Sequence, residues 1–380
     1  MTEATRLSNA LVTAAKTPIT LLQATANEPL ITGPLLYILT RGSADIRQRL
    51  LNLPYVRKLF ERNGGERLAL AIKTLKVLFV LGVIKRLNQG LNRIALNGWQ
   101  LPGTNNRARW NWDGRTETVV ITGGCSGFGY EMVKGFARKA KVIVIDVSEL
   151  PAEFEKLPEV HYYKCDLTDT EAVVSTCASI KNRFGHPTVL INNAGIGSGK
   201  TILDTPHTFT DAIFKVNLSS HFVLIKEFLP GMLEKRKGHI VGIASMASFV
   251  SAPGLVDYCV TKAGVLALHE GLRNELLMRY ENGSCVASTT VHPSWHATGI
   301  VKPWENKLKE HGIRPDPPKN VADAVVEQVL AHRSGRIYMP RSAESQAGTR
   351  QLPLWLQDWF LGVVSINPFA KSKGFQFDNA

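Results

Sequence analysis

The stretch Thr118-Val-Val-Ile-Thr-Gly-Gly-Cys-Ser-Gly-Phe-Gly-Tyr130 decides the fold, because in it an apolar, β-branched strand runs into a glycine-rich turn. A helix is expected to follow over Tyr130–Arg138. Glycines let the backbone turn tightly and approach a pyrophosphate with no Cβ in the way. The helix N-terminus then presents unpaired N–H groups to phosphate. The stretch therefore predicts a dinucleotide site made by Thr122, Gly123, Ser126, Gly127, Phe128 and Gly129.

An acidic residue stands where such a site needs one. Asp146 closes the next strand, 23 residues beyond Gly123. A carboxylate there binds both ribose hydroxyls but repels a 2′-phosphate, which favours NAD over NADP. The alternative is that Asp146 caps a helix or is a solvated acid at a strand end. Asp166, which ends the third strand, is expected either to serve the adenine side of the cofactor or to cap the following helix.

Short apolar runs alternate with longer amphipathic stretches after residue 116. Their β-branched, nearly continuous apolar character suits a parallel sheet covered on both faces. The alternation predicts an α/β fold with a doubly wound, Rossmann-type parallel sheet. The expected strands are Val119–Thr122, Val142–Val147, Val160–Tyr163, Val189–Asn192, Ile240–Ala244 and Val286–Val291.

A tyrosine and a lysine, Tyr258 and Lys262, stand four residues apart and therefore on one face of a helix. A phenol is a poor base at neutral pH, but a nearby ammonium lowers its pKa toward the working pH of a general acid–base catalyst. A tyrosine and a lysine at this spacing are common by chance, on amphipathic helices whose lysine is merely solvated. Their context here is not: Ser245 ends a strand 13 residues before Tyr258, and Asn217 lies 28 residues before Ser245.

Together these motifs resemble the short-chain dehydrogenase/reductase superfamily over about residues 117–340. The chain has the TGxxxGxG loop at Thr122–Gly129 and NNAG at Asn192–Gly195. The resemblance implies that Tyr258 transfers the proton and that Ser245 holds the substrate oxygen. It implies further that Lys262 lowers the pKa of Tyr258 and binds the nicotinamide ribose, and that Asn217 supports a water that relays protons. Ser248 is the alternative to Ser245, but Ser245 has the expected spacing.

The same resemblance adds further cofactor contacts and one departure. The additional cofactor-binding residues are Asn193, Ala194, Gly195, Pro293 and Thr298, together with Tyr258 and Lys262. Where the family usually has glycine after proline, this chain has Ser294, whose side chain is expected to reshape the nicotinamide pocket or its loop. Family members are commonly homo-oligomers, so a homo-oligomer is expected. No metal is implied.

Composition excludes several classes of protein. The 380 residues are 44% hydrophobic and 20% charged, which is ordinary globular usage. The mean hydropathy of −0.04 excludes a polytopic membrane protein. Five cysteines without a CxxC pair argue against a disulfide framework and a zinc site, and indicate a reducing compartment.

The N-terminal third differs from the rest. Residues 1–115 carry 17 Lys and Arg against 6 Asp and Glu, so they hold most of the net charge of +13. The turn-rich segment Leu101–Arg115 separates a helical extension, residues 1–116, from the dehydrogenase domain, residues 117–340. The apolar segment Leu68–Ile84 is marginal for a spanning helix, which needs about 20 apolar residues. Apolar segments among basic residues favour an element lying on an anionic membrane surface; the alternative is helices packed on the catalytic domain.

Residues 341–380 form an apolar tail. Its segment Leu352–Val364, with Trp355, Trp359 and Phe360, is expected to form a helix that lies at a membrane interface, covers a substrate pocket or makes a dimer contact. The long segment Trp295–Pro318 is expected to be the substrate lid. These aromatic residues predict a bulky lipophilic substrate.

The sequence therefore predicts an NAD-dependent oxidoreductase that interconverts a secondary alcohol and a ketone on a steroid, retinoid, terpenoid or polyketide type of substrate, oxidation being favoured. A loose resemblance to retinol and 17β-hydroxysteroid dehydrogenases places it on the cytosolic face of the endoplasmic reticulum or a lipid droplet, and otherwise in the cytoplasm. The alternative is a catalytically silent, membrane-associated scaffold. No nucleic acid is expected as a partner, because the basic N-terminus lacks a matching motif.

Overall fold

The computed structural model describes residues 28–60, 64–99, 108–310 and 312–360. Contacts divide the chain into two compact units, Met1–Ile94 and Ala95–Ala380, which are described separately. The division falls earlier than the boundary expected after residue 116. Trp110 and Trp112, in the segment expected to be a linker, pack against the core of the second unit.

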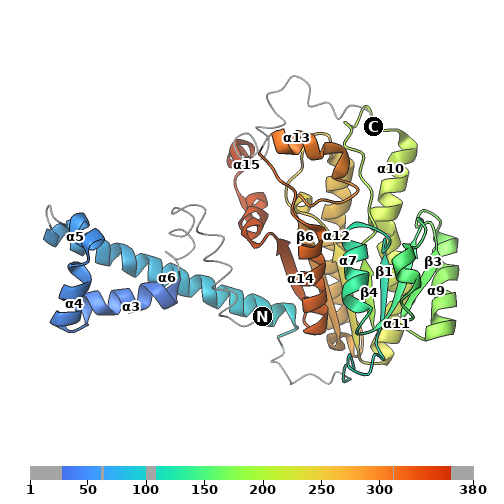
Figure 1. Cartoon of the computed structure of the whole chain (residues 1–380), viewed down its shortest axis with the longest axis horizontal. Helices are drawn as coiled ribbons and strands as arrows, with labels where there is room; N and C mark the ends of the chain where they lie inside the picture. Colours follow the sequence, from blue (N-terminus) through green and yellow to red (C-terminus); the bar gives the residue numbers. More distant parts are fainter. Residues whose placement is uncertain (1–27, 61–63, 100–107, 311, 361–380) are drawn as a thin grey trace. The chain divides into compact units, whose positions relative to one another are not determined.

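The second unit is built on a seven-stranded sheet in the order β3-β2-β1-β4-β5-β6-β7, and all neighbouring strands are parallel (Figure 1). The strands are β1 Thr118–Thr122, β2 Lys141–Asp146, β3 Val160–Lys164, β4 Val189–Asn192, β5 Gly238–Ile243, β6 Val286–Pro293 and β7 Gly335–Met339. The predicted α/β fold with a Rossmann-type parallel sheet is confirmed. β7 is missing from the predicted strands because it is a short, partly exposed edge strand that begins with Gly335 and Arg336.

Helices cover both faces of this sheet. Alternate residues of β1 show why: Val119 and Ile121 belong to one core with α7 and α14, whereas Val120 belongs to the other core with α9, α11 and α12. The helices are α7 Gly127–Phe136, α8 Ala152–Glu155, α9 Thr170–Phe184, α10 His207–Phe214, α11 Ser220–Glu234, α12 Val256–Met278, α13 Glu305–Glu310, α14 Pro318–Leu330 and α15 Leu354–Phe360. Short helical turns are η1 Lys215–Ser219, η2 Met246–Ser248, η3 Gly283–Cys285, η4 Lys302–Trp304 and η5 Arg341–Gln351.

Two helix predictions need adjustment at their ends. The helix expected over Tyr130–Arg138 begins at Gly127, because the glycine-rich turn itself forms its first turn, and it ends at Phe136. The helix expected over Leu352–Val364 is α15, and residues 361–364 lie outside the described residues. Trp355 on α15 is 71% exposed.

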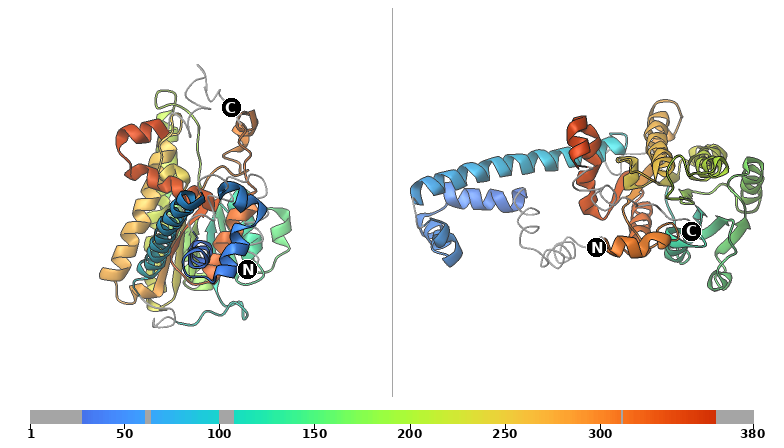
Figure 2. Two further views of the ribbon diagram at one scale, coloured as in Figure 1. Left: turned by 90° about the vertical axis from the view of Figure 1, so that its left-hand side faces the viewer. Right: turned by 90° about the horizontal axis from the view of Figure 1, so that it is seen from above.

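The first unit is helical, with α3 Pro29–Thr40, α4 Ala44–Leu51, α5 Pro54–Phe60 and α6 Gly64–Leu96. α3 lies beside α6 (Figure 2), where Gly33 approaches the ring of Phe79 and Glu28 pairs with Arg86. The apolar segment Leu68–Ile84 lies within α6. In the part of the chain that the structure describes, no helix has the length and hydropathy of a membrane span.

Candidate active site

The glycine-rich turn between β1 and α7 has a backbone that only glycine accommodates. Gly123 and Gly127 have φ values of +66° and +55°, in the left-handed region that favours glycine. A Cβ on Gly129 would clash with the carbonyl oxygen of Gly123. The space beside Gly127 is more open, because a Cβ there would make only an ordinary van der Waals contact, with Thr298 at 3.6 Å. The turn is therefore a tight backbone cradle ending at a helix N-terminus, which is the arrangement that binds a pyrophosphate.

Asn193, just after β4, and Thr122, at the end of β1, hold this turn in place. The Asn193 side-chain amide donates to the carbonyls of Thr122 and Gly123, at 2.9 and 3.0 Å. The Thr122 hydroxyl accepts from the backbone N–H groups of Asn193 and Ala194, at 3.0 and 3.1 Å. Both Asn193 amide hydrogen bonds are thus used within the protein. Asn193 therefore fixes the shape of the turn.

Asp146 at the end of β2 is fixed beside the same turn. One of its carboxylate oxygens accepts from the backbone N–H of Cys125 at 2.9 Å, and the other from that of Ser148 at 3.0 Å. The residue is only 9% exposed. Because a carboxylate oxygen accepts two hydrogen bonds, each retains acceptor capacity for a ribose hydroxyl.

Asp166 is exposed and makes a different contact. Its carboxylate accepts from the backbone N–H of Thr168 at 2.8 Å, which closes a turn after β3. The predicted alternative, that Asp166 caps the next helix, is wrong, because Asp169 is the N-cap of α9 and accepts from Ala172 N at 3.0 Å. Asp169 is close enough to accept a hydrogen bond from the first turn of α9, whereas Asp166, three residues earlier, accepts from Thr168 before the helix begins.

Tyr258 and Lys262 lie on the first turns of α12. The Lys262 ammonium donates to the carbonyl of Ile243 at 2.8 Å and lies 5.5 Å from the centre of the Tyr258 ring. Burial lowers the pKa of Lys262 to about 8. Burial raises the pKa of Tyr258 to about 12, although hydrogen bonding with Ser245 acts in the opposite direction. The lowered Tyr258 pKa that the sequence predicts is therefore not what this structure shows, because desolvation outweighs the stabilisation of the phenolate.

Ser245 follows β5 and begins the turn η2. Its hydroxyl accepts from the Ala247 N–H at 3.1 Å and donates to the Pro293 carbonyl at a long 3.4 Å. The hydroxyl of the rival, Ser248, is buried and donates to the backbone carbonyl of Lys262 at 2.8 Å. Ser248 therefore braces α12, and Ser245 is the serine that contacts Tyr258.

Asn217 is fully buried in the π-helical turn η1. Its amide exchanges hydrogen bonds with the backbone of Ile196, accepting from the N–H at 2.8 Å and donating to the carbonyl at 2.9 Å. The amide also donates to the Thr261 hydroxyl at 3.2 Å. A Cβ on Gly195 would lie 3.5 Å from both Asn217 Oδ1 and Lys262 Nζ. Asn217 and Lys262 thus flank Gly195, and a π-helical turn is a frequent marker of function.

The segment after β6 brings the remaining predicted residues to the site. Thr298 lies beside Gly127, and the ring of His296 packs edge-on against Phe128 with centroids 5.4 Å apart. Ser294, the departure from the family pattern, donates its backbone N–H to the Met339 carbonyl at 2.7 Å. The loop is therefore tied to the end of β7 by its backbone, which any residue at position 294 provides.

Apolar side chains surround the tyrosine. Leu255, Cys259 and Trp304 form a buried cluster, against which partly buried hydrophobic residues pack. Those residues are Ala247, Ala252, Tyr258, Trp295 and Ile300. Trp304 lies in η4 of the expected lid segment. The surroundings of the phenol are thus mainly apolar.

Two contacts at the site involve residues that the motifs do not include. The Thr261 hydroxyl accepts a hydrogen bond from the Asn217 side-chain amide. His292 Nδ1 forms a hydrogen bond with the backbone carbonyl of Ser245 at 3.1 Å. Thr261 precedes Lys262 in the motif region. Nothing in the local sequence distinguishes His292 from any other polar residue at a strand end.

The geometry is that of a dinucleotide-dependent oxidoreductase, with a backbone cradle for a pyrophosphate and a tyrosine, a serine, a lysine and an asparagine brought together beyond the ends of β4 and β5. The family model described as short chain dehydrogenase matches residues 117–309. The chain belongs to the short-chain dehydrogenase/reductase family.

Named relatives agree with this assignment. The dehydrogenase RED2 of Cochliobolus heterostrophus is 41% identical over 200 residues, which are 52% of this chain and 75% of the relative. The human epidermal retinol dehydrogenase 2 is 32% identical over 234 residues, covering 59% and 74% of the two chains. Human short-chain dehydrogenase/reductase 3 is 34% identical over 231 residues, covering 57% and 73%.

A solved structure supports the fold. The ligand-free aldohexose dehydrogenase of Thermoplasma acidophilum has a TM-score of 0.51 and 22% sequence identity, and the match covers 60% of this chain and 94% of that one. The family model and the curated relatives show that the chain is an oxidoreductase of a family that uses nicotinamide cofactors and small-molecule substrates.

Proposed function

We propose that the protein is an NAD-dependent oxidoreductase that interconverts a secondary alcohol and a ketone on a lipophilic substrate, with oxidation favoured. The observation that carries the proposal is the meeting of Tyr258 with Ser245 on one side, and of Lys262 with Asn217 around Gly195 on the other. These four side chains come from η1, the turn after β5 and two turns of α12, and residues so placed together indicate a site for proton transfer to and from a substrate oxygen.

The cofactor fits the residues that the fold places at the end of the sheet. Gly123 and Gly129 allow the tight turn, because a Cβ on either would clash with neighbouring atoms of the protein, and Gly127 leaves the side of the turn open. Asp146 has acceptor capacity for two ribose hydroxyls. Its negative charge would repel a 2′-phosphate, which supports NAD over NADP. When bound, the nicotinamide accepts or donates the hydride.

The chain's own residues move and hold the proton. In the oxidative direction Tyr258 Oη accepts the proton of the substrate hydroxyl, and in the reductive direction it returns that proton. Ser245 gives up its long bond to Pro293 and donates to the substrate oxygen. Lys262, charged below a pKa of about 8, stabilises the phenolate when it forms. Asn217, held rigid by Ile196, keeps the region beside Lys262 polar for proton replenishment.

The apolar cluster around Tyr258 supports a lipophilic substrate. Trp295, Ile300 and Trp304 supply apolar surface on the side of the expected lid. Several relatives are named retinol dehydrogenases, which supports testing a retinoid. A panel of all-trans-retinol, oestradiol and borneol with NAD, followed by NADH absorbance, tests the proposal. Turnover of oestradiol or borneol, the two secondary alcohols, is expected. Turnover of retinol alone would contradict the proposed substrate class, because retinol is a primary alcohol, and failure on all three and on their carbonyl forms would contradict the proposal as a whole.

We also propose that the helical unit lies on an anionic membrane surface, as at the cytosolic face of the endoplasmic reticulum or a lipid droplet. Exposed apolar residues recur on α6 every three or four residues, at Val77, Leu81, Ile84, Leu87 and Leu91. Exposed Lys73, Lys76 and Lys85 accompany them. An apolar stripe with basic residues is the pattern of an interfacial helix.

Sedimentation with vesicles tests this second proposal. Binding to phosphatidylcholine vesicles that contain phosphatidylserine is expected, with loss of binding in high salt or on Leu81→Glu. Retention on DNA instead would point to nucleic acid. A homo-oligomer, which the family supports, is tested on the same material by sedimentation equilibrium.

A catalytically silent scaffold is the alternative function. The complete set of Tyr258, Lys262, Ser245 and Asn217 argues against it. The scaffold predicts that NADH binds but that no alcohol or carbonyl compound of the panel is converted.

A further inference from the structure

We propose that His292 is a positioning residue that fixes the backbone of Ser245, and so aims the serine hydroxyl at the substrate oxygen. The inference rests on the proposed oxidoreductase function. His292 lies on β6, just before Pro293, and is fully buried. It does not touch the substrate oxygen itself and acts through the serine.

The hydrogen bond from His292 links β6 to the chain that follows β5, one residue beyond the last hydrogen bond between the two backbones. The parallel pairing ends at Ile243↔Val291, and the Ala244 N–H still donates to the Val291 carbonyl at 2.8 Å. One residue further, the chain leaves the sheet to form η2. There His292 Nδ1 reaches the Ser245 carbonyl at 3.1 Å, so a side chain supplies the ladder bond that the backbone no longer makes.

β6 thus holds the serine at two points. His292 bonds to the Ser245 carbonyl, and the Pro293 carbonyl accepts from the Ser245 hydroxyl at 3.4 Å. The first contact fixes the backbone, and the second is the long bond that a substrate oxygen replaces. Loss of the first would let the turn η2 shift without unfolding the sheet.

The tautomer of His292 is determined by its partners. A carbonyl oxygen only accepts, so Nδ1 carries the hydrogen. Nε2 of the neutral ring therefore accepts from the Thr290 hydroxyl, which lies at 3.0 Å. Burial lowers the pKa of His292 to about 4, so the ring stays neutral and keeps this tautomer across the physiological range.

Aromatic neighbours stop the ring from turning. Phe249, which follows η2, lies 4.8 Å from His292 between centroids, and Tyr338 of β7 stacks on it at 5.4 Å with planes 24° apart. Arg350 of η5 adds a bond to the backbone of η2, from Nη1 to the Ser248 carbonyl at 3.0 Å. The serine turn is therefore supported by β6, β7 and η5, the first part of the C-terminal tail.

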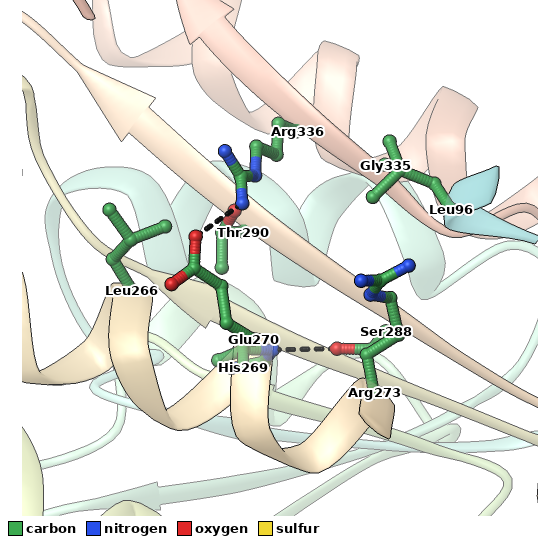
Figure 3. Close-up of a pocket in the computed structure, with 9 residues that line it drawn as sticks. All are labelled: Leu96, Leu266, His269, Glu270, Arg273, Ser288, Thr290, Gly335 and Arg336. Carbon is green, nitrogen blue, oxygen red and sulfur yellow. Dashed lines mark hydrogen bonds and ion pairs between the residues drawn. The ribbon is translucent and has the colours of Figure 1, made fainter. Parts of the chain in front are cut away.

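His269 provides a matched control (Figure 3). It is also buried, burial also lowers its pKa to about 4, and its Nδ1 bonds to Ser288, another β6 residue, at 2.9 Å. It faces the hollow lined by Glu270 and Arg336 and bonds to no member of the catalytic set in the described residues. A purely structural role for buried histidines would make the two positions equivalent.

Three variants test the proposal on the panel alcohol that the full-length protein oxidises fastest. His292→Leu removes the donor and is expected to lower kcat up to about 100-fold, the effect of misplacing a reacting group by about 1 Å. His292→Asn places an amide N–H where Nδ1 was and is expected to restore most of kcat. His269→Leu is expected to leave kcat near that of the unchanged protein. NADH binding should be the same in all three.

The outcomes separate this inference from the proposed function. If the unchanged protein and Tyr258→Phe are equally inactive while NADH binds, the proposed function fails. If the unchanged protein is active but His292→Leu is as active, or if His292→Asn does not recover more than His292→Leu, the positioning role is wrong. ¹⁵N NMR of the histidine rings gives a readout without substrate: an Nδ1–H tautomer of His292 that does not titrate at neutral pH is expected, and an Nε2–H tautomer would overturn the assignment.

Discussion

Asn217 and Lys262 meet at Gly195: the amide oxygen of one and the ammonium of the other both lie 3.5 Å from the point that a Cβ on Gly195 would occupy. The glycine keeps open the space where the family mechanism places a relay water between these two groups. A methyl group there would make ordinary van der Waals contacts, so it would not strain the fold.

Gly195→Ala is therefore expected to fold normally but to lose activity. We expect kcat to fall at least about tenfold, a part of the 10²- to 10⁴-fold that general acid–base catalysis contributes. The thermal midpoint should stay unchanged. Steady-state kinetics and thermal unfolding of the same preparation check this. Unchanged kcat would show that the space beside Gly195 has no part in proton transfer.

Asp146 should decide the cofactor. Removal of a charged hydrogen-bond acceptor costs about 1.5–3 kcal/mol, so Asp146→Ala is expected to weaken NADH binding about 10- to 100-fold and to reduce the discrimination against NADPH. Glu149→Ala, three residues further along the chain, is the control and should change little because its carboxylate is exposed and pairs with Lys164. Nicotinamide fluorescence titrations measure both. Equal effects of the two variants would contradict the assigned role of Asp146.

The pH dependence follows from the directions of the two pKa shifts. Oxidation needs the Tyr258 phenolate, and a pKa near 12 means that its fraction grows about tenfold per unit of pH well below that value. Lys262 loses its stabilising charge above a pKa of about 8. Oxidation is thus expected to rise from about pH 6 to about pH 8 and then to level off, whereas carbonyl reduction, which uses the protonated phenol, shows no such rise. A kcat/KM profile for oxidation that falls between these pH values would contradict this reading.

A buried ion pair outside the site gives a stability prediction. Glu117 is fully buried and pairs with Lys237 at 2.9 Å. Lys237→Met would leave this carboxylate without its counter-charge and is expected to lower the free energy of unfolding by about 3–5 kcal/mol. The double variant with Glu117→Gln should recover most of that loss. Denaturant unfolding of the second unit checks both, and a single variant as stable as the unchanged protein would be inconsistent with the pair's burial.

Local patterns predicted most of the fold because its signals are periodic. The β1–turn–α7 stretch and the apolar runs of β2 to β6 each carry enough information to be recognised alone. The edge strand β7 does not, because it begins with Gly335 and Arg336 and is half exposed. The packing of Trp110 and Trp112 against the core of the second unit was not predictable either, because it joins residues that are far apart in the sequence.

The site shows the same division. Resemblance to the family predicts a site that contains Ser245, Tyr258 and Lys262. In the structure Ser245 hydrogen-bonds with Tyr258, and the Lys262 ammonium lies 5.5 Å from the centre of the Tyr258 ring. The direction of the Tyr258 pKa shift was not predictable, because it depends on burial that only the tertiary structure determines. His292 was missed for a similar reason: its contact with Ser245 joins two strands whose pairing the sequence does not state.

The central claim is that Tyr258 transfers the proton in an oxidoreductase reaction. The most direct test compares Tyr258→Phe with the unchanged protein in two assays, conversion of the fastest panel alcohol with NAD and fluorescence titration with NADH. We expect the variant to lose turnover by at least about 10²-fold, the lower end of what general acid–base catalysis contributes, and to bind NADH as before. Turnover that survives the loss of the hydroxyl would contradict the account.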